Sequence, residues 1–146
     1  MTQLDALKAI AARDGGLLRP AAVVEEARNK RSPLHRAFEW NDGKAAEKYR
    51  LLQAQKLIRS FHVVKDDGDM GISVPVFVSV SSDRTGGKEN NPYRLIDDVM
   101  QTDDLLSIAE NDALEQLRGL RNRYDHLKRL GDIWDAIDGH GGAGRR

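Results

Sequence analysis

Hydrophobic residues near the start of the chain recur at the spacing of two amphipathic helices. The pattern predicts a first helix over residues 2–13, and the glycine pair after Asp14 ends it because glycine accepts the left-handed backbone conformation. A second helix should run from Pro20 to about Asn29, since the N–H that proline lacks would be unpaired in the first turn anyway. The positions expected to face inward are Leu4, Leu7, Ile10, Ala11, Val23, Val24 and Ala27.

The next helical signals begin at Ser32-Pro33, where serine is a good N-cap and proline fits the first turn. We expect a short helical turn to Trp40 and then a longer helix over residues 43–60. Since successive helical residues turn by about 100°, one narrow polar stripe of the longer helix consists of Lys44, Lys48, Gln55 and Arg59. The apolar residues on the two sides of this stripe are Ala45, Tyr49 and Leu52, and Leu51, Ala54 and Ile58. Such a helix is expected to pack on two sides and to present only the stripe to solvent or to a ligand.

After Ser60 the hydrophobic period shortens from about 3.6 residues to 2, which indicates β-strands. Residues 61–65 and 72–80 form two such runs around the polar turn 66–71, so we expect a β-hairpin. Pro75 cannot donate to a strand ladder, and the second strand should therefore have a free edge there. The polar residues 81–92 predict a mobile loop.

The remainder of the chain has helical periodicity. One segment is expected from Tyr93 to Met100, and Asp103 or Asp104 should cap a longer helix. The positions that follow a heptad spacing, and that are the candidates for oligomerisation, are Leu106, Ala113, Leu117, Leu120, Tyr124, Leu127 and Trp134. Glu110 and Gly131 interrupt the ends, so the continuous seam should run from Ala113 to Leu127. About three heptads are marginal alone, and we expect the helix to pack partly on its own head and partly on a second copy.

The order of elements indicates a mainly α protein with a β-hairpin, which is an α+β class. Residues 1–80 would form a head that follows the order of a winged helix-turn-helix, in which the third helix enters the DNA major groove. Loop 81–92 would separate this head from packing helices over residues 93–138. The glycine-rich tail, 139–146, is expected to be disordered.

Composition limits the class of protein. The chain has 146 residues, of which 40% are hydrophobic and 32% charged, which suits one small domain with an extension. It has no cysteine, so disulfides and thiolate metal sites are excluded. No apolar run approaches the roughly 20 residues that span a bilayer, and the N-terminal residues do not form a signal peptide. We expect a cytoplasmic protein that does not enter a membrane.

Charge is unevenly divided, although the formal net charge of the whole chain is +0. Residues 1–60 hold 12 Lys/Arg and 7 Asp/Glu, a net +5, and the remainder holds 11 and 16, a net −5. Together with the stripe of the third helix this favours duplex DNA as a partner, because Arg and Lys reach guanine and Gln pairs with adenine. Candidate phosphate contacts in the preceding connection are Arg28, Lys30, Arg31 and Arg36.

Two features weigh against DNA. The connection 30–41 is longer than the usual helix-turn-helix turn of about 3–4 residues, and the hairpin tip, 66–69, is acidic and would repel phosphate. A solvated basic face on an α+β domain is the plainer interpretation. The chain could also be a protein-interaction module, such as an adaptor, an inhibitor of a host complex or an assembly factor. It would then work without nucleic acid, through its C-terminal helix and loop 81–92.

No motif indicates catalysis, a cofactor or a metal. Gly86-Gly87-Lys88 lacks the rest of a phosphate-binding loop. The acidic hairpin tip lacks the glutamate of an EF-hand, since Phe77 stands at the twelfth position. His35, Glu39 and His62 could ligate a metal, but isolated histidines are more often structural. We therefore expect a non-enzymatic protein with no cofactor.

One resemblance concerns the segment Ser32-Pro33-Leu34-His35-Arg36-Ala37-Phe38-Glu39-Trp40 and the residues that follow it, Asp42, Lys44-Ala45-Ala46 and Tyr49-Arg50. This part of the chain resembles small uncharacterised bacteriophage and prophage proteins over about residues 15–65. The resemblance implies a phage or prophage setting, with roles such as gene regulation, DNA transactions or interference with a host complex. It implies nothing about individual residues.

Overall fold

The computed structural model describes residues 1–41, 43–65, 71–85 and 88–140, without the side chains of Lys44, Ala45, Lys65 and Lys88. The helices are α1 (Gln3–Arg13), α2 (Pro20–Ala27), α3 (Lys44–Ser60), α4 (Ile96–Gln101), α5 (Asp103–Arg123) and α6 (Gly131–Gly139). The strands are β1 (His62–Lys65), β2 (Ile72–Pro75), β3 (Phe77–Val78) and β4 (Arg94–Leu95). Short 3-10 turns are η1 (His35–Ala37), η2 (Ser81–Asp83), η3 (Lys88–Asn90) and η4 (Lys128–Leu130). The protein is mainly helical with two small antiparallel sheets, which confirms the α+β class.

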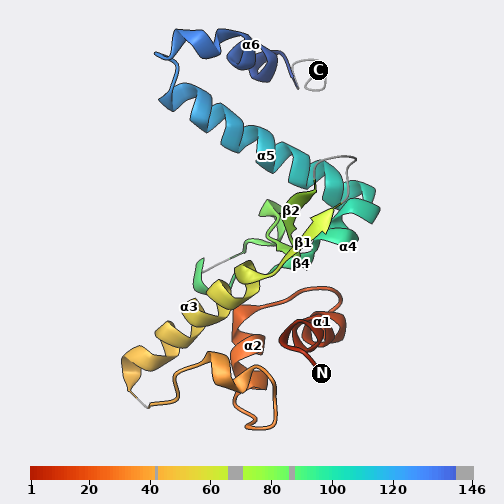
Figure 1. Ribbon diagram of the computed structural model, residues 1–146, viewed down its shortest axis with the longest axis vertical. Coiled ribbons are helices and arrows are strands. Elements are labelled where there is room, and N and C mark those ends of the chain that lie inside the picture. The colour runs from red at the N-terminus through yellow and green to blue at the C-terminus, as the bar shows by residue number, and fades with distance from the viewer. Residues whose placement is uncertain (42, 66–70, 86–87, 141–146) are drawn as a thin grey trace.

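Helices α1, α2 and α3 form the head together with the strands (Figure 1). The three predicted helices are confirmed, each within about two residues at its ends. Helix α1 begins with a capping box, in which the Thr2 hydroxyl accepts from the Asp5 amide (3.1 Å) and the Asp5 carboxylate accepts from the Thr2 amide (2.9 Å). It ends as predicted, because Gly15 and Gly16 have φ of 60° and 92°, values that favour glycine.

The core of the head joins parts of the chain that the sequence assigned to separate units. Its buried members from α1, α2, α3 and their connections are Ala6, Leu7, Ile10, Ala11, Leu18, Val23, Val24, Ala27, Leu34, Phe38, Ala54 and Ile58. Val76, Phe77 and Tyr93 complete it. Leu18 and Tyr93 exchange two backbone hydrogen bonds (2.7 and 2.8 Å), which ties the chain beyond loop 81–92 to the head. The predicted helix from Tyr93 is therefore wrong for its first three residues, and α4 begins only at Ile96.

The predicted β-hairpin is confirmed for β1 and β2, in which Val63 lies opposite Val74. Its second strand is shorter than predicted. It stops at Pro75, and β3 pairs instead with β4, so that Phe77 lies opposite Leu95. Val76 connects the two sheets, because its N–H donates to the Phe61 carbonyl just before β1 (3.0 Å) and its carbonyl accepts from the Ile96 amide just after β4 (2.8 Å). The turn 66–70 lies outside the described residues.

Described residues of the predicted loop 81–92 are held by specific contacts. The Asn90 side chain accepts from the Ala21 amide at the start of α2 (2.9 Å), and Pro92 is buried. At the other end, the Ser81 amide donates to Asp112 of α5 (2.8 Å). The loop thus contributes two anchored 3-10 turns, η2 and η3, and connects the head to the C-terminal helices.

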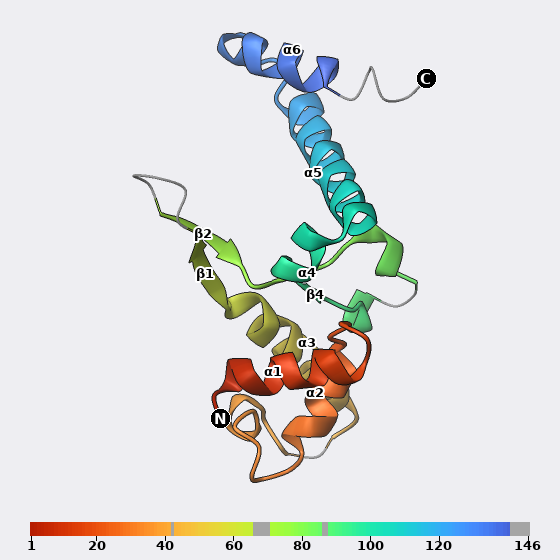
Figure 2. The same cartoon turned by 90° about the vertical axis from the view of Figure 1, so that its right-hand side faces the viewer.

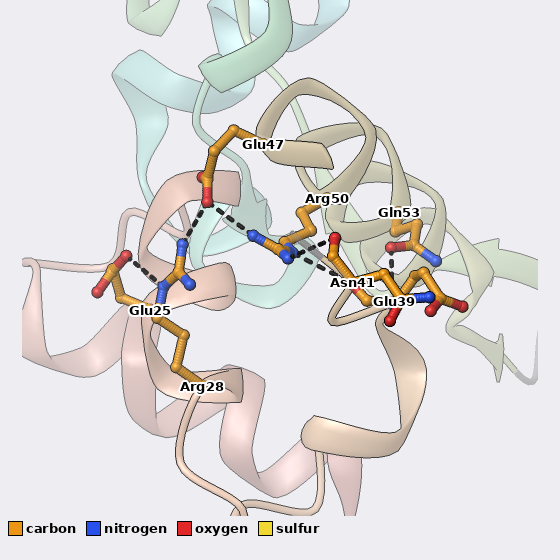
Figure 3. A network of polar contacts seen from close by, with 7 residues as sticks. All are labelled: Glu25, Arg28, Glu39, Asn41, Glu47, Arg50 and Gln53. Carbon is orange, nitrogen blue, oxygen red and sulfur yellow. Dashed lines mark hydrogen bonds and ion pairs between the residues drawn. The ribbon is translucent and has the colours of Figure 1, made fainter. Parts of the chain in front are cut away.

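The connection between α2 and α3 is held by a buried arginine. Arg50 is 2% exposed, and its guanidinium donates to the Glu39 carbonyl (3.0 Å) and the Asn41 carbonyl (3.3 Å), as Figure 3 shows. It also pairs with Glu47 (2.8 Å), which is shared with Arg28 (2.6 Å). Both guanidinium carbons lie near the Trp40 ring, 5.0 Å away for Arg50 and 5.7 Å for Arg28. These contacts fix the extra segment that lengthens the turn before α3.

Helix α5 runs from the head as a rod, and α6 lies at its far end (Figure 2). The predicted continuous seam from Ala113 to Leu127 is wrong, because α5 ends at Arg123 and Leu127 and Trp134 lie beyond it. The chain reverses there, and Arg121 pairs with Asp138 of α6 (2.8 Å) while Ile137 becomes buried. Residues 141–146 of the predicted disordered tail lie outside the described residues. In the part of the chain that the structure describes, no helix is long and apolar enough to cross a membrane.

Replacing Arg50 by methionine is expected to lower the free energy of unfolding by about 2–3 kcal/mol, because the charge-assisted bonds to two carbonyls are lost from a buried position. Urea denaturation measures the change. Arg36→Met is the matched control, since Arg36 is exposed, and should alter stability by less than about 0.5 kcal/mol. Equal losses of stability in the two variants would contradict the structural role of Arg50.

A second prediction concerns acid. Hydrogen bonding and charge from Arg28, with a smaller contribution from Arg50, hold the pKa of Glu47 below its ordinary value of 4.5. A depressed folded pKa stabilises the protein above the unfolded value, and this contribution is lost as pH falls through the folded pKa. Glu47→Gln should therefore be less stable at neutral pH and should lose less stability below pH 4.5. Arg28→Gln should likewise make stability depend less on pH in this range. Thermal unfolding measured from pH 6 to about 3 tests this prediction. If the stability of both variants changes with pH in the same way as that of the unmodified protein, the ion pair between Glu47 and Arg28 is contradicted.

Candidate nucleic-acid interface

Among the residues that the structure describes, helix α3 packs on one side. Ala54 and Ile58 are fully buried, and the opposite side of the helix faces solvent. Figure 1 shows α3 along one side of the head, with α1 and α2 beyond it on the other. The residues on the solvent side, which we call the outer face of α3, are Lys48, Tyr49, Leu52, Lys56 and Arg59. The prediction that α3 packs on two sides is wrong, because Tyr49 and Leu52 are each 54% exposed.

The outer face carries three cations and no carboxylate. Lys48, Lys56 and Arg59 are exposed, and none of them has an ion-pair partner among the residues that the structure describes. The acid of this helix, Glu47, lies on another side and is engaged by Arg28 and Arg50. The basic charge of the outer face is therefore available to an external anion.

The shape of the surface indicates the size of ligand that it could meet. One open hollow beside the outer face is lined by Tyr49, Gln53 and Lys56, and another by Leu52, Lys56 and Arg59. Both open to solvent along the helix. Small-molecule sites usually enclose most of the ligand surface, so this arrangement favours contact with a macromolecule.

The predicted stripe is only partly exposed. Lys48 and Arg59 face solvent as expected, and the Arg59 Nε donates to the Tyr93 hydroxyl (3.1 Å). Gln55 is 9% exposed, and its amide donates to the Glu89 carbonyl (2.8 Å), so its predicted place on an exposed stripe is wrong. The 3-10 turn η3, which contains Glu89, packs against this side of the helix, which the sequence did not indicate. The side chain of Lys44 lies outside the described residues.

The four basic residues predicted as phosphate contacts differ in availability. Arg28 donates to Glu25 (3.0 Å) and Glu47 (2.6 Å), and hydrogen bonding to Glu47 and then Glu25 raises its pKa above the ordinary value. Its charge is neutralised within the head. Lys30, Arg31 and Arg36 are exposed on the connection before α3, and in the described ranges they form no ion pair. None of these three lines either hollow beside the outer face.

Lys56 is the residue that sequence reasoning missed on this surface. On a helical wheel it lies between Tyr49 and Leu52, in the sector that the pattern assigned to packing. A charged residue in the middle of an apolar sector is the signal that could have shown that the sector is solvent-facing.

The described residues contain no group of three or more His, Asp or Glu side chains that could hold a metal ion. His35, one of the three residues considered as metal ligands from the sequence, is used structurally, because its Nδ1 donates to the Ala27 carbonyl (2.7 Å) and its ring stacks on Trp40. Comparison of the chain with protein-family models, with curated proteins and with solved structures gives no match.

Proposed function

We propose that the protein is a non-enzymatic DNA-binding or regulatory protein whose outer face of α3 contacts duplex DNA. The observation that carries the proposal is the set of three exposed cations on one helix face without an acidic neighbour on that face. Lys and Arg on a helix can reach both phosphates and guanine edges in the major groove. Tyr49 and Leu52 would supply apolar contact between them, for example with thymine methyl groups.

The order of helices and hairpin supports the same proposal. In a winged helix-turn-helix the third helix enters the groove and the hairpin contacts the backbone. Here β1 and β2 leave the C-terminal end of α3 and project from the head (Figure 2). We propose a winged-helix-like mode in which α3 is the groove helix. A phage or prophage setting, which the resemblance of residues 15–65 implies, is part of this proposal.

Reversing two charges on the outer face tests the proposal. Lys48→Glu with Lys56→Glu should abolish duplex binding at low salt, because two phosphate-facing cations become repulsive anions. Binding by the unmodified chain should fall steeply with salt, with a slope of log affinity against log salt of about −0.9 for each phosphate neutralised. Electrophoretic shift assays at several salt concentrations measure both quantities.

The matched control is Lys8→Glu with Lys128→Glu, which makes the same change in net charge at exposed positions on α1 and η4. This variant should bind DNA like the unmodified chain. Equal loss in the two double variants would mean that net charge alone governs binding. An unmodified chain that binds no duplex at low salt would remove the proposal.

We also propose that α5 pairs with a second copy of the chain. None of its 21 residues is buried, although it carries Leu at five positions including Leu105 and Leu106. Leu117, Leu120 and Tyr124 lie on one side of the helix end and are 41%, 43% and 38% exposed. A helix of this length gains little stability in water without tertiary packing. A homodimer would bury this side and present two α3 helices, as two-fold symmetric DNA-binding proteins present their recognition helices.

Light scattering tests the pairing. The unmodified chain should have about twice the 16.3 kDa mass of one copy, and Leu117→Glu with Leu120→Glu should give a helical monomer. Gln116→Glu with Asn122→Glu places the same charges on exposed polar positions of α5 and should leave the dimer intact. A monomeric unmodified chain would contradict self-association. The exposed side of α5 would then fit a protein-interaction module, in which a different protein covers it.

A further inference from the structure

The C-terminal end of the outer face of α3 borders an open hollow that the sequence did not indicate. Five residues line it: Arg59, Ser79, Arg84, Asn91 and Tyr93. They come from α3, from the strand exit after β3, and from the two ends of the segment 84–93. Anchoring of η2 and η3 brings these parts together. Arg59 belongs both to the outer face and to this hollow.

Both arginines of the hollow are oriented by neutral acceptors. The Arg59 Nε donates to the Tyr93 hydroxyl (3.1 Å). The Arg84 Nε donates to the Ser79 hydroxyl (3.1 Å), and its Nη2 donates to the Ser79 carbonyl (3.0 Å). Neither guanidinium forms an ion pair with a carboxylate in the described ranges. Two positive charges that line one hollow repel each other, and a bound anion would relieve that repulsion.

The acidic residues near the hollow are engaged or exposed. Asp83 accepts from two nitrogens of Arg94 (2.6 and 3.0 Å), and this hydrogen bonding raises the pKa of Arg94. The negative charge beside Arg84 is therefore already paired. Glu89 is exposed, and its backbone carbonyl accepts from Gln55.

Hydrogen-bond donors in the hollow match a tetrahedral oxyanion. Each guanidinium has N–H groups beyond those that bind Tyr93 and Ser79, and a planar fork of such donors suits phosphate oxygens. The Tyr93 hydroxyl uses a lone pair to accept from Arg59, and no acceptor for its own proton is found among the described residues. The Asn91 amide lines the same hollow. These donors converge from two sides on one space.

We propose that this hollow binds one phosphate group, and that in the working protein the group is a backbone phosphate of DNA lying against α3. The assignment of the phosphate to DNA rests on the proposed function of the outer face. The hollow lies at the end of that face and shares Arg59 with it, so a duplex along α3 would place a phosphate there. Arg84 becomes a positioning contact that fixes the duplex without reading its sequence.

Two measurements on the full chain test the site. In the first, inorganic phosphate is titrated while the side-chain Nε–H signals of Arg59 and Arg84 are followed by NMR, with chloride at matched ionic strength as the control salt. The signals should shift with saturation in phosphate only. In the second, duplex DNA binding is measured against salt for Arg84→Gln. Affinity should fall about fivefold and the salt slope should become shallower by about 0.9, one phosphate contact.

Arg129→Gln is the matched control, since Arg129 is an exposed arginine of η4 remote from the hollow. It should leave both measurements unchanged. Arg84→Lys keeps the charge but loses the fork, and should recover part of the affinity.

The outcomes separate this site from the proposed function. If DNA binding depends on Lys48 and Lys56 but not on Arg84, and phosphate causes no specific shift, the proposed phosphate site is overturned. The proposed function of the outer face would then still hold. A saturable phosphate shift in a chain that binds no duplex would overturn the proposed function. It would assign the hollow to the phosphate group of a smaller molecule. The proposal as stated is supported when Arg84→Gln, but not Arg129→Gln, weakens the phosphate-dependent shift of the Arg59 signal and lowers the duplex affinity about fivefold.

Discussion

Burial of one side of α3 against the head determines which of its residues can meet a ligand. Ala54 and Ile58 are fully buried on that side. Arg50, one turn earlier, is buried beneath the preceding connection and bonded to two of its carbonyls. Rotation of the helix about its axis would break these contacts together. The register of α3 is thereby fixed, and with it the position of the outer face.

The same contacts explain how the lengthened connection before α3 is accommodated. A turn this long would ordinarily leave the third helix loosely oriented. Here the guanidinium groups of Arg28 and Arg50 both lie near the Trp40 ring. Glu47 pairs with both arginines, as Figure 3 shows. The charge of Arg28 stabilises the head and is not available to DNA. One predicted phosphate contact is thus a structural residue, for a reason that appears only in three dimensions.

Periodicity predicted the parts of the fold that local sequence determines. The helices of the head, the β1–β2 hairpin and the glycine end of α1 depend on spacing, capping and turn residues. Long-range pairing was not predictable in this way. The two-residue strands β3 and β4 have no alternation to detect, and burial of Gln55 depends on a carbonyl 34 residues away in the chain. On α3 the sequence indicated that the cations share one side of the helix. It did not indicate that Tyr49 and Leu52 lack a second packing partner.

The proposed function requires α3 to be the surface that meets DNA. A titration of isotope-labelled protein with duplex DNA, followed by two-dimensional amide and side-chain NMR, tests this directly. We expect the shifts to concentrate on the outer face from Lys48 to Arg59 and on residues 84–93, with α1 and the far end of α5 unaffected. Shifts confined to α5 and α6, or spread evenly over exposed cations, would contradict it.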